Sequence, residues 1–387
     1  MTFAPDIAEV APASERTVLE IDLDAIAANW RDLAARAAPA ECAGVVKADG
    51  YGLGLAEVAP ALATAGCQTF FVATLDEAHR LRDVLPDKAI YVLDGLLPGT
   101  VNDCVFHNLR PVLSSFADVE EWTRECREAE TSYPAAIHVD TGMTRLGLNR
   151  DDIQRLTATP DILSPFVPSL VMSHLACADT PEHPLNATQN AAFQAVRDAF
   201  PTSPLSLANS AATLSAPAMA YDLVRPGIAL YGGLALAEPP NPMRPTVRYH
   251  GRILQTQTVA AGTSIGYGAT FETQRMTRLA TIATGYADGY LRTSVPADRA
   301  TGPMVAFAGN LAPIVGRISM DLITVDVTDI DEQHACRGGW ATLIGDQTSV
   351  DDVAEAAGTI GYEILTRISS RTHRIYHPAK ADAAVMD

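Results

Sequence analysis

The feature that most constrains the fold is an alternation of short apolar runs with helical patterns over the first 240 residues. Apolar residues at three- and four-residue intervals predict helices over residues 55–65, 75–85, 116–130 and 186–200. Apolar, β-rich runs lie between most of these helices and begin near Cys42, Thr69, Ala89, Leu109, Ala135, Ser169, Pro204 and Asp222. Eight strand candidates alternating with helices predict a (β/α)8 TIM-like barrel, which binds ligands at the carboxyl ends of its strands.

The segments outside this alternation predict a second, mainly β domain. Residues 18–23 alternate like a strand, and Asp24 is expected to cap the helix that follows. The proline-rich stretch 238–242 cannot continue a helix or an inner strand. Beyond it we expect one helix, over 350–357, and strands over 247–259, 278–284, 303–308, 322–327 and 340–344. We therefore predict a barrel domain over 17–240, whose first strand could join the second domain, and a β domain over 241–387.

Charge and hydropathy favour a small-molecule ligand. The 387-residue chain has a formal net charge of −18 and thus no general attraction for nucleic acid or anionic lipid. An anionic ligand would need a local pocket. No uninterrupted apolar stretch is long enough to span a membrane, and residues 1–16 lack the basic start and apolar segment of a signal peptide.

The cysteines indicate a reducing compartment and no metal centre. All six are scattered, without a CxxC pair or a cysteine–histidine cluster at metal-ligand spacing. Reduced thiols in a cytoplasmic protein are the simplest interpretation. We expect no metal site.

Lys47 is the first candidate for chemistry. It ends the apolar run Ala43-Gly44-Val45-Val46 and precedes a glycine-rich turn that contains Tyr51. The carboxyl end of a buried parallel strand is where ligands collect, and the turn lets the backbone approach one closely. A lysine there suggests imine chemistry, although a strand end is also a common place for a lysine to meet water.

Polar residues follow several other predicted strands. Asp140 and Arg145 come after one strand, and His174 closes the next. Asn209-Ser210 and Arg225-Pro226-Gly227-Ile228 follow the last two. Taken alone, each of these residues is explained by a purely structural role, such as a surface arginine or a helix-capping serine. Their positions at consecutive strand ends, however, would bring them together. Ser210, Gly227 and Ile228, with Tyr51, could offer N–H and hydroxyl groups to a phosphate.

The run around Lys47 resembles the lysine motif of the alanine racemases, pyridoxal 5'-phosphate (PLP) enzymes with a barrel and an appended β domain. Three further segments, 264–268, 283–290 and 315–321, resemble other motifs of this family. All the matches follow the family's order and extend from near Val18 to near Tyr376. The resemblance implies interconversion of L- and D-alanine by a homodimer, without nucleic-acid or membrane partners, and a supply of D-alanine for peptidoglycan. It also implies that the active sites are shared between subunits.

The resemblance assigns roles to individual residues. Lys47 would carry PLP as an imine and act as one base, and Tyr267 would reach the other subunit's site as the second base. The cofactor-binding set is Lys47, Tyr51, His174, Asn209, Ser210, Arg225, Gly227, Ile228 and Tyr362. The substrate-binding set is Arg145, Met320 and Asp321, and the entrance set is Tyr286, Arg292 and Asp179.

Arg225 is the most informative of these residues. An arginine at the pyridine nitrogen can only donate a hydrogen bond, so it suits an unprotonated ring that is a weaker electron sink than a protonated one. A weaker sink favours return of the proton to the α-carbon over transamination. The ordinary pKa of tyrosine is ~10, so Tyr267 would need a positively charged or hydrogen-bonded partner to act as a base near neutral pH. His174 and Arg225 could form a chain of such partners.

The sequence also departs from common family residues. Leu53 replaces a histidine, Asp49-Gly50 an Asn-Ala pair and Ala269 an arginine. His138 stands where some members carry a carbamylated lysine that orients the residue matching Arg145. Histidine cannot form that carbamate, so either it bonds Arg145 differently or the arginine is held by other groups.

Two alternatives follow from the same residues. One is a racemase of a broader set of amino acids, since the residues that limit pocket size cannot be read from the sequence. The other is a non-catalytic PLP-binding regulatory protein, although such proteins generally lack the β domain. A basic amino-acid decarboxylase is disfavoured, because the second domain's one cysteine, Cys336, lies outside the Tyr267 motif.

Overall fold

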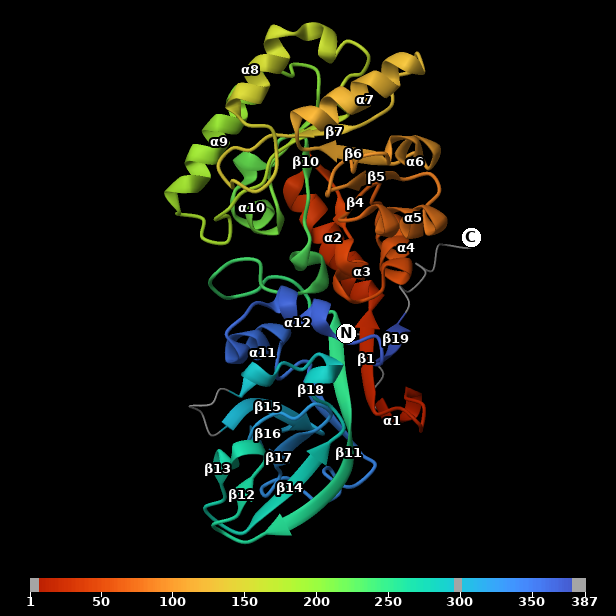
Figure 1. Cartoon of the computed structure of the whole chain (residues 1–387). Coiled ribbons are helices and arrows are strands. Elements are labelled where there is room, and N and C mark those ends of the chain that lie inside the picture. The colour runs from red at the N-terminus through yellow and green to blue at the C-terminus, as the bar shows by residue number, and fades with distance from the viewer. Residues whose placement is uncertain (1–6, 296–300, 378–387) are drawn as a thin grey trace, which may run out of the picture. The chain divides into compact units, whose positions relative to one another are not determined.

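The computed structural model describes residues 7–295 and 301–377. Two compact units form, one from residues 27–230 and 234–243, the other from residues 1–26, 231–233 and 244–387. The first is called the barrel unit and the second the β unit, and Figure 1 shows their elements. The division at 17–240 and 241–387 stays a prediction.

The barrel unit alternates parallel strands with helices. Its strands are β2 Glu41–Cys42, β3 Gly44–Val45, β4 Thr69–Val72, β5 Ala89–Val92, β6 Arg110–Leu113, β7 Ala136–His138, β8 Leu170–Met172, β9 Leu205–Ser206 and β10 Leu223–Val224. Its helices are α3 Lys47–Tyr51, α4 Leu55–Ala65, α5 Leu75–Val84, α6 Val101–Phe106, α7 Phe116–Glu128, α8 Arg150–Ala158, α9 Pro184–Val196 and α10 Ser210–Ser215, with α2 Leu23–Ala37 leading in. The strand and helix positions confirm the predicted alternation.

Hydrogen bonds close these strands into a ring. Strands β3 to β9 form one parallel sheet in chain order. Strand β10 pairs in parallel with β2, and the Arg225 N–H beyond it donates to Ala208 beyond β9. The Ala43 N–H, between β2 and β3, donates to Val224 of β10. The fold class is therefore the predicted barrel, with each residue of strands such as β4 and β8 buried.

Side-chain caps fix where several helices begin. Thr74 and Glu77 form a capping box at α5, and Ser115 with Asp118 does the same at α7. The predicted cap of α2 is wrong. The helix starts one residue earlier than Asp24, and the Asp22 carboxylate accepts the Ala25 N–H at 2.9 Å. Asp22 is the last residue of β1 and directly precedes Leu23, the first residue of α2, so Asp22 is the residue in the capping position.

The β unit is built on an eight-stranded sheet. The order is β14-β17-β16-β15-β18-β11-β1-β19, and β1 pairs antiparallel with the long strand β11 and parallel with β19 (Figure 1). The strands are β1 Thr17–Asp22, β11 Val247–Val259, β14 Thr277–Ile282, β15 Thr301–Phe307, β16 Asn310–Val315, β17 Ile323–Asp326, β18 Trp340–Ile344 and β19 His373–His377, with a small pair β12 Ser264–Ile265 and β13 Phe271–Glu272. The strand predicted ahead of the barrel thus pairs within this sheet.

Helices in the β unit are short. They are α1 Ile7–Val10, α11 Val350–Ala357 and α12 Gly361–Arg367. The prediction of a single helix after residue 241 is wrong, because α12 follows α11 after a turn at Gly358, whose φ of 69° ends the first helix. No helix in the described part of the chain has the length and apolarity that a bilayer crossing requires.

Candidate active site

Lys47 opens a tight turn at the carboxyl end of β3. Ala48, Asp49 and Gly50 have φ angles of 53°, 54° and 63°, and Tyr51 has 56°. Consecutive left-handed residues other than glycine are costly, so the surrounding contacts must impose them. The Asp49 carboxylate helps to do so, since it accepts the Leu55 N–H at 3.2 Å and pairs with Arg80 at 2.7 Å. The turn places the Lys47 amine and the Tyr51 ring in fixed positions.

The Tyr51 hydroxyl lies against Gly227. A Cβ at Gly227 would collide with that hydroxyl, so any larger residue would have to displace the Tyr51 side chain. Beside it, the buried Ser210 hydroxyl accepts the N–H groups of Gly227 at 2.8 Å and Ala229 at 3.3 Å. The Ser210 O–H is then still available as a donor. Tyr51, Ser210 and Gly227 therefore form a cradle of hydroxyl and backbone groups, whose binding of a phosphate stays a prediction.

Asn209 supports this cradle by capping the helix that carries Ser210. Its side chain accepts the Ala212 N–H at 3.1 Å and caps α10, which begins at Ser210. Ile228 begins a 3-10 helix, and the first N–H groups of any helix have no partner inside it. Asn209 thus acts on helix geometry, while Ile228 offers a backbone donor.

Arg225 is fixed by groups on two neighbouring strand ends. Its guanidinium donates to the Ser206 hydroxyl, to the Ser173 carbonyl at 2.6 Å and lies 3.4 Å from His174 Nδ1. Burial lowers the pKa of Arg225 to about 10, so it stays charged at neutral pH. Among the described residues no carboxylate opposes that effect. The Arg225 guanidinium therefore offers only hydrogen-bond donors, and its role at an unprotonated pyridine nitrogen stays a prediction.

Two buried imidazoles lie among these cations. Burial, Arg225 and Arg145 lower the pKa of His138 to about 4 and that of His174 to about 3. Both rings are therefore neutral at pH 7. Burial and the nearby Arg145 charge also lower the pKa of Lys47, against the pull of Glu77 and Asp94. A lysine with a lowered pKa is more often a free nucleophile or base at neutral pH.

The Arg145 loop is held without a carbamate. The Asp140 carboxylate accepts the N–H groups of Gly142 at 2.9 Å and Thr144 at 3.1 Å. Within the described residues no hydrogen bond joins His138 to Arg145, whose side chain is exposed. Of the two options left open by the sequence, the structure favours an arginine positioned by its own turn.

Two residues that the sequence analysis missed tie these loops together. Ser206, a polar residue inside the apolar run of β9, orients Arg225. Gln189 of α9 is fully buried and bonds three backbone or side-chain groups: it donates to the His174 carbonyl and the Thr141 hydroxyl and accepts the Ala176 N–H. A buried glutamine on a helix is a weak signal without the contacts it makes.

Two turns of the β unit that contact each other carry Met320, Asp321 and Tyr286. Met320 and Asp321 lie beside Tyr286, because the Tyr286 and Ala287 N–H groups donate to Ser319 and Met320. Arg371 donates at 2.7 Å to Asp321 and at 2.6 Å to the buried Asp288. These two carboxylates raise the pKa of Arg371, so the cation is firmly held.

Tyr267 projects from a separate turn of the same unit. Its neighbours Gly266 and Gly268 have φ angles of 71° and 74°, and it is 66% exposed. The turn is anchored by Ile265, which packs with Leu279 and Val315.

The remaining candidates are more peripheral. Arg292 donates to the Ile318 carbonyl at 2.9 Å, near the Met320 turn. Tyr362 is half-buried on α12, and Asp179 is exposed in the barrel unit, where its carbonyl accepts the Ala237 N–H. The barrel candidates thus gather in one unit and the others, Tyr267, Met320, Asp321, Tyr286, Arg292 and Tyr362, lie in the β unit.

Comparison with known proteins identifies the family. A model described as alanine racemase, N-terminal domain, matches residues 21–235, and one described as alanine racemase, C-terminal domain, matches residues 246–376. An alanine racemase of Methylobacterium nodulans is 49% identical over 95% of this chain and 97% of its own length. A catabolic alanine racemase of Agrobacterium fabrum is 43% identical over 95% of each chain.

The structural comparison agrees with the sequence comparison. The crystal structure of alanine racemase from Bartonella henselae with covalently bound pyridoxal phosphate has a TM-score of 0.88 and 41% identity, covering 94% of this chain and 99% of that one. The chain belongs to the alanine racemase family, as its motifs predicted.

Proposed function

We propose that this chain is a PLP-dependent racemase that interconverts L- and D-alanine, with Lys47 and the partner subunit's Tyr267 as the two bases. The observation that supports it most is the buried Arg225, held by Ser206 and Ser173 next to a neutral His174. An enzyme that used a protonated pyridine ring would need a carboxylate at this position.

The barrel unit fits PLP. The hydroxyls of Tyr51 and Ser210 and the backbone at Gly227 and Ile228 would hold the phosphate, and Arg225 would donate to the ring nitrogen. In a chain of net charge −18, the cations Arg145 and Arg225 make this site locally positive, so it suits a dianion. Tyr362 is proposed to add a further hydroxyl. When bound, PLP would supply the electron sink that makes the substrate α-proton acidic.

Proton transfer needs a group on each face of the substrate. Lys47, whose pKa is lowered by burial and by Arg145, would take or return the α-proton on one face. Tyr267 of the partner subunit would do so on the other. Its exposed position between two glycines suits a residue that completes a site on another chain. We infer a homodimer on this ground.

Substrate positioning falls to charged groups from both chains. Arg145 would interact with the cofactor ring oxygen and orient the substrate carboxylate. Met320 and Asp321 of the partner subunit would limit the pocket, with Asp321 held by Arg371. Tyr286, Arg292 and Asp179 are proposed to line the entrance. A pocket of this kind would favour alanine, and the D-alanine product would serve peptidoglycan synthesis in the cytoplasm.

The test is exchange of the α-hydrogen in deuterated water. Each alanine enantiomer is incubated separately with PLP-loaded enzyme, and deuterium at Cα and the enantiomer ratio are followed together. We expect deuterium in both enantiomers and the same final mixture from either starting material. Imine absorption without exchange would instead indicate the non-catalytic PLP-binding protein.

The broader-specificity alternative is separated by a second assay. Turnover of alanine, serine, lysine and arginine is compared under one set of conditions. Alanine should be the best substrate. Faster turnover of a basic amino acid would contradict the narrower assignment.

A further inference from the structure

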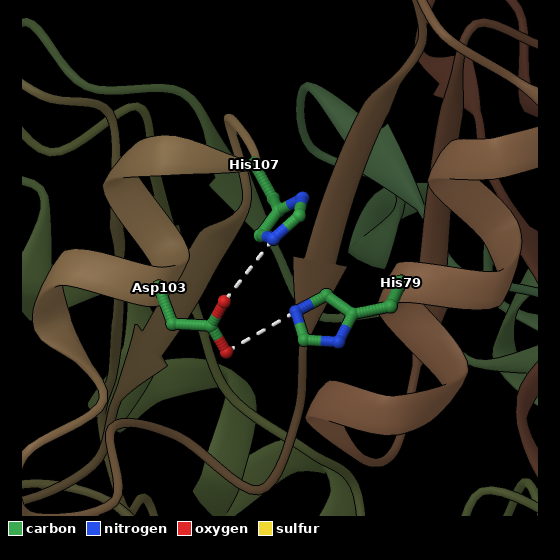
Figure 2. Close-up of side chains that lie close together, drawn as sticks. All are labelled: His79, Asp103 and His107. Atoms are coloured by element: carbon green, nitrogen blue, oxygen red, sulfur yellow. Dashed lines mark ion pairs between the residues drawn. The ribbon is translucent and has the colours of Figure 1, made fainter.

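Two histidines and an aspartate meet where α5 and α6 of the barrel unit lie together, and none of the three is a candidate residue of the racemase site. Figure 2 shows His79 and His107 directed at the carboxylate of Asp103. His79 Nε2 lies 3.2 Å from one carboxylate oxygen, and His107 Nε2 lies 3.3 Å from the other. All three potential ligand atoms lie within 4.8 Å of one another. This group of residues is called the His-Asp-His cluster.

The elements that carry the cluster are tied together. Asp103 lies in the first turn of α6, and His107 follows one helical turn later, just beyond the helix's last residue, while His79 comes from α5. Arg82, on the turn after His79, donates to the carbonyls of His107 at 3.1 Å and Asn108 at 2.7 Å. The same guanidinium donates to three carbonyls beyond α5, those of Leu85, Pro86 and Lys88. The two helix ends are therefore fixed relative to each other before any ligand binds.

One ligand atom of the cluster lacks a hydrogen bond. His79 Nε2 is shielded from solvent and has no hydrogen-bond partner among the described residues, although the Asp103 oxygen is near. A neutral imidazole nitrogen that carries a lone pair would be repelled by the carboxylate lone pairs. A cation between them removes that repulsion, because imidazole nitrogen and carboxylate oxygen are both ligands of divalent first-row metals.

We propose that the His-Asp-His cluster binds one zinc-class divalent cation, with His79, Asp103 and His107 as protein ligands and water completing the coordination. A zinc ion about 2.0–2.1 Å from each ligand keeps tetrahedral ligand atoms about 3.4 Å apart. The two nitrogen–oxygen distances of 3.2 and 3.3 Å, which run to different oxygens of Asp103, are close to that spacing. The cluster has the donor types of that metal and one net negative charge when the imidazoles are neutral. The acidic chain adds a general attraction for cations.

The position of the cluster indicates a stabilising role. His107 lies shortly before β6 begins at Arg110, so it is at the amino end of a barrel strand, opposite the end that carries Lys47. Groups at the amino ends of barrel strands support the fold, whereas the chemistry occurs at the carboxyl ends. The metal would join α5 to α6 and raise thermal stability without changing the rate of racemisation.

The test uses the PLP-loaded enzyme after removal of free metal. Calorimetric titration with ZnCl2 should give one equivalent per chain, and zinc should raise the thermal midpoint. His79→Gln and Asp103→Asn should each weaken zinc binding about tenfold or more and abolish the rise in midpoint. His183→Asn, which keeps an acceptor at the first residue before α9, is the matched control and should bind zinc like the parent.

A spectroscopic arm separates this site from the thiols. Co2+ bound at the cluster should show visible bands of nitrogen and oxygen ligands without a thiolate band in the near ultraviolet, which would indicate Cys336 or Cys177 instead. If one variant does not fold, His107→Gln replaces it. Absence of zinc binding, or binding that the variants leave unchanged, would overturn the proposal and leave the cluster as ion-paired side chains without a metal.

Discussion

The barrel unit and the β unit present their candidate residues in opposite ways. In the barrel unit Arg225 is 5% and Ser210 is 3% exposed, and each has its partners within the unit. In the β unit Tyr267 is 66% and Met320 is 53% exposed. Burial and hydrogen bonds within one unit fix the barrel residues that are proposed to bind the cofactor. The exposed Tyr267, between two glycines, suits its proposed role in the site of a partner chain.

The electrostatics of the two units differ as well. The barrel site gathers cations and neutral imidazoles whose pKa values fall because the groups repel one another and are buried. The β unit instead pairs its cation, Arg371, with Asp288 and Asp321, and these carboxylates raise its pKa. The barrel site therefore suits the anion proposed to bind there, whereas Arg371 in the β unit already has two carboxylate partners.

The largest effects on activity are expected from removing the proposed base of each unit, Lys47 in the barrel unit and Tyr267 in the β unit. Lys47→Ala should lose the visible imine absorption together with racemisation. Tyr267→Phe should keep the absorption, because the barrel cradle is intact, but lose roughly 100- to 10,000-fold in turnover, the usual contribution of a general acid or base. Absorption spectra and racemisation rates measured on the same samples check both. Full activity in either variant would contradict the assignment of two bases.

A smaller effect is expected from Gly227→Ala. The backbone of Gly227 accepts alanine, but the added Cβ would displace the Tyr51 hydroxyl. PLP affinity, measured by absorbance titration of apoenzyme, should fall about tenfold, which corresponds to the loss of one good hydrogen bond to a charged group.

The matched background for this variant is Tyr51→Phe. In that background Gly227→Ala should cost less than in the parent, because the hydroxyl that it displaces is already gone. Equal losses of PLP affinity in both backgrounds would show that the glycine acts independently of Tyr51.

The smallest effect concerns the pH dependence of stability. His138 has a folded pKa of about 4, below the ordinary value near ~6.5 of an unfolded chain. As the pH falls from 7 to 5, the unfolded chain binds a proton that the folded chain excludes, so the free energy of unfolding decreases. His138→Gln cannot titrate and should lose less stability over that interval, by on the order of 1 kcal/mol. Urea midpoints at the two pH values, at one enzyme concentration, measure the difference, and an equal loss in parent and variant would contradict the burial of a neutral ring.

Much of the barrel could be predicted because each of its signals is local. The helix predicted over 55–65 coincides with α4, and the apolar run before Lys47 ends where β3 meets the turn. Parallel strands end on one side of a barrel, so residues such as Arg225 and His174, far apart in sequence, could be expected together. Their hydrogen bond partners could not, since Ser206 and Gln189 act through contacts that no periodicity records.

The β unit was less predictable for physical reasons. Strand β16 contains Pro313, which weakens a strand signal, and α12 is too short for a clear helical pattern. The glycines around Tyr267 indicate a turn, but not what the exposed ring meets. The His-Asp-His cluster could not be predicted from the sequence, because its residues come from two separate elements, α5 and the α6 region, and include no cysteine.

The central claim is that Lys47 of one chain works with Tyr267 of another, and mixed dimers test it most directly. Lys47→Ala and Tyr267→Phe chains carrying different affinity tags are coexpressed, and the heterodimer is isolated by both tags in turn. If each active site takes Lys47 from one chain and Tyr267 from the other, one of the heterodimer's two sites has both bases. Activity should then return to about half that of the parent dimer. If both bases come from the same chain, neither site is complete and the heterodimer should be as inactive as the single variants.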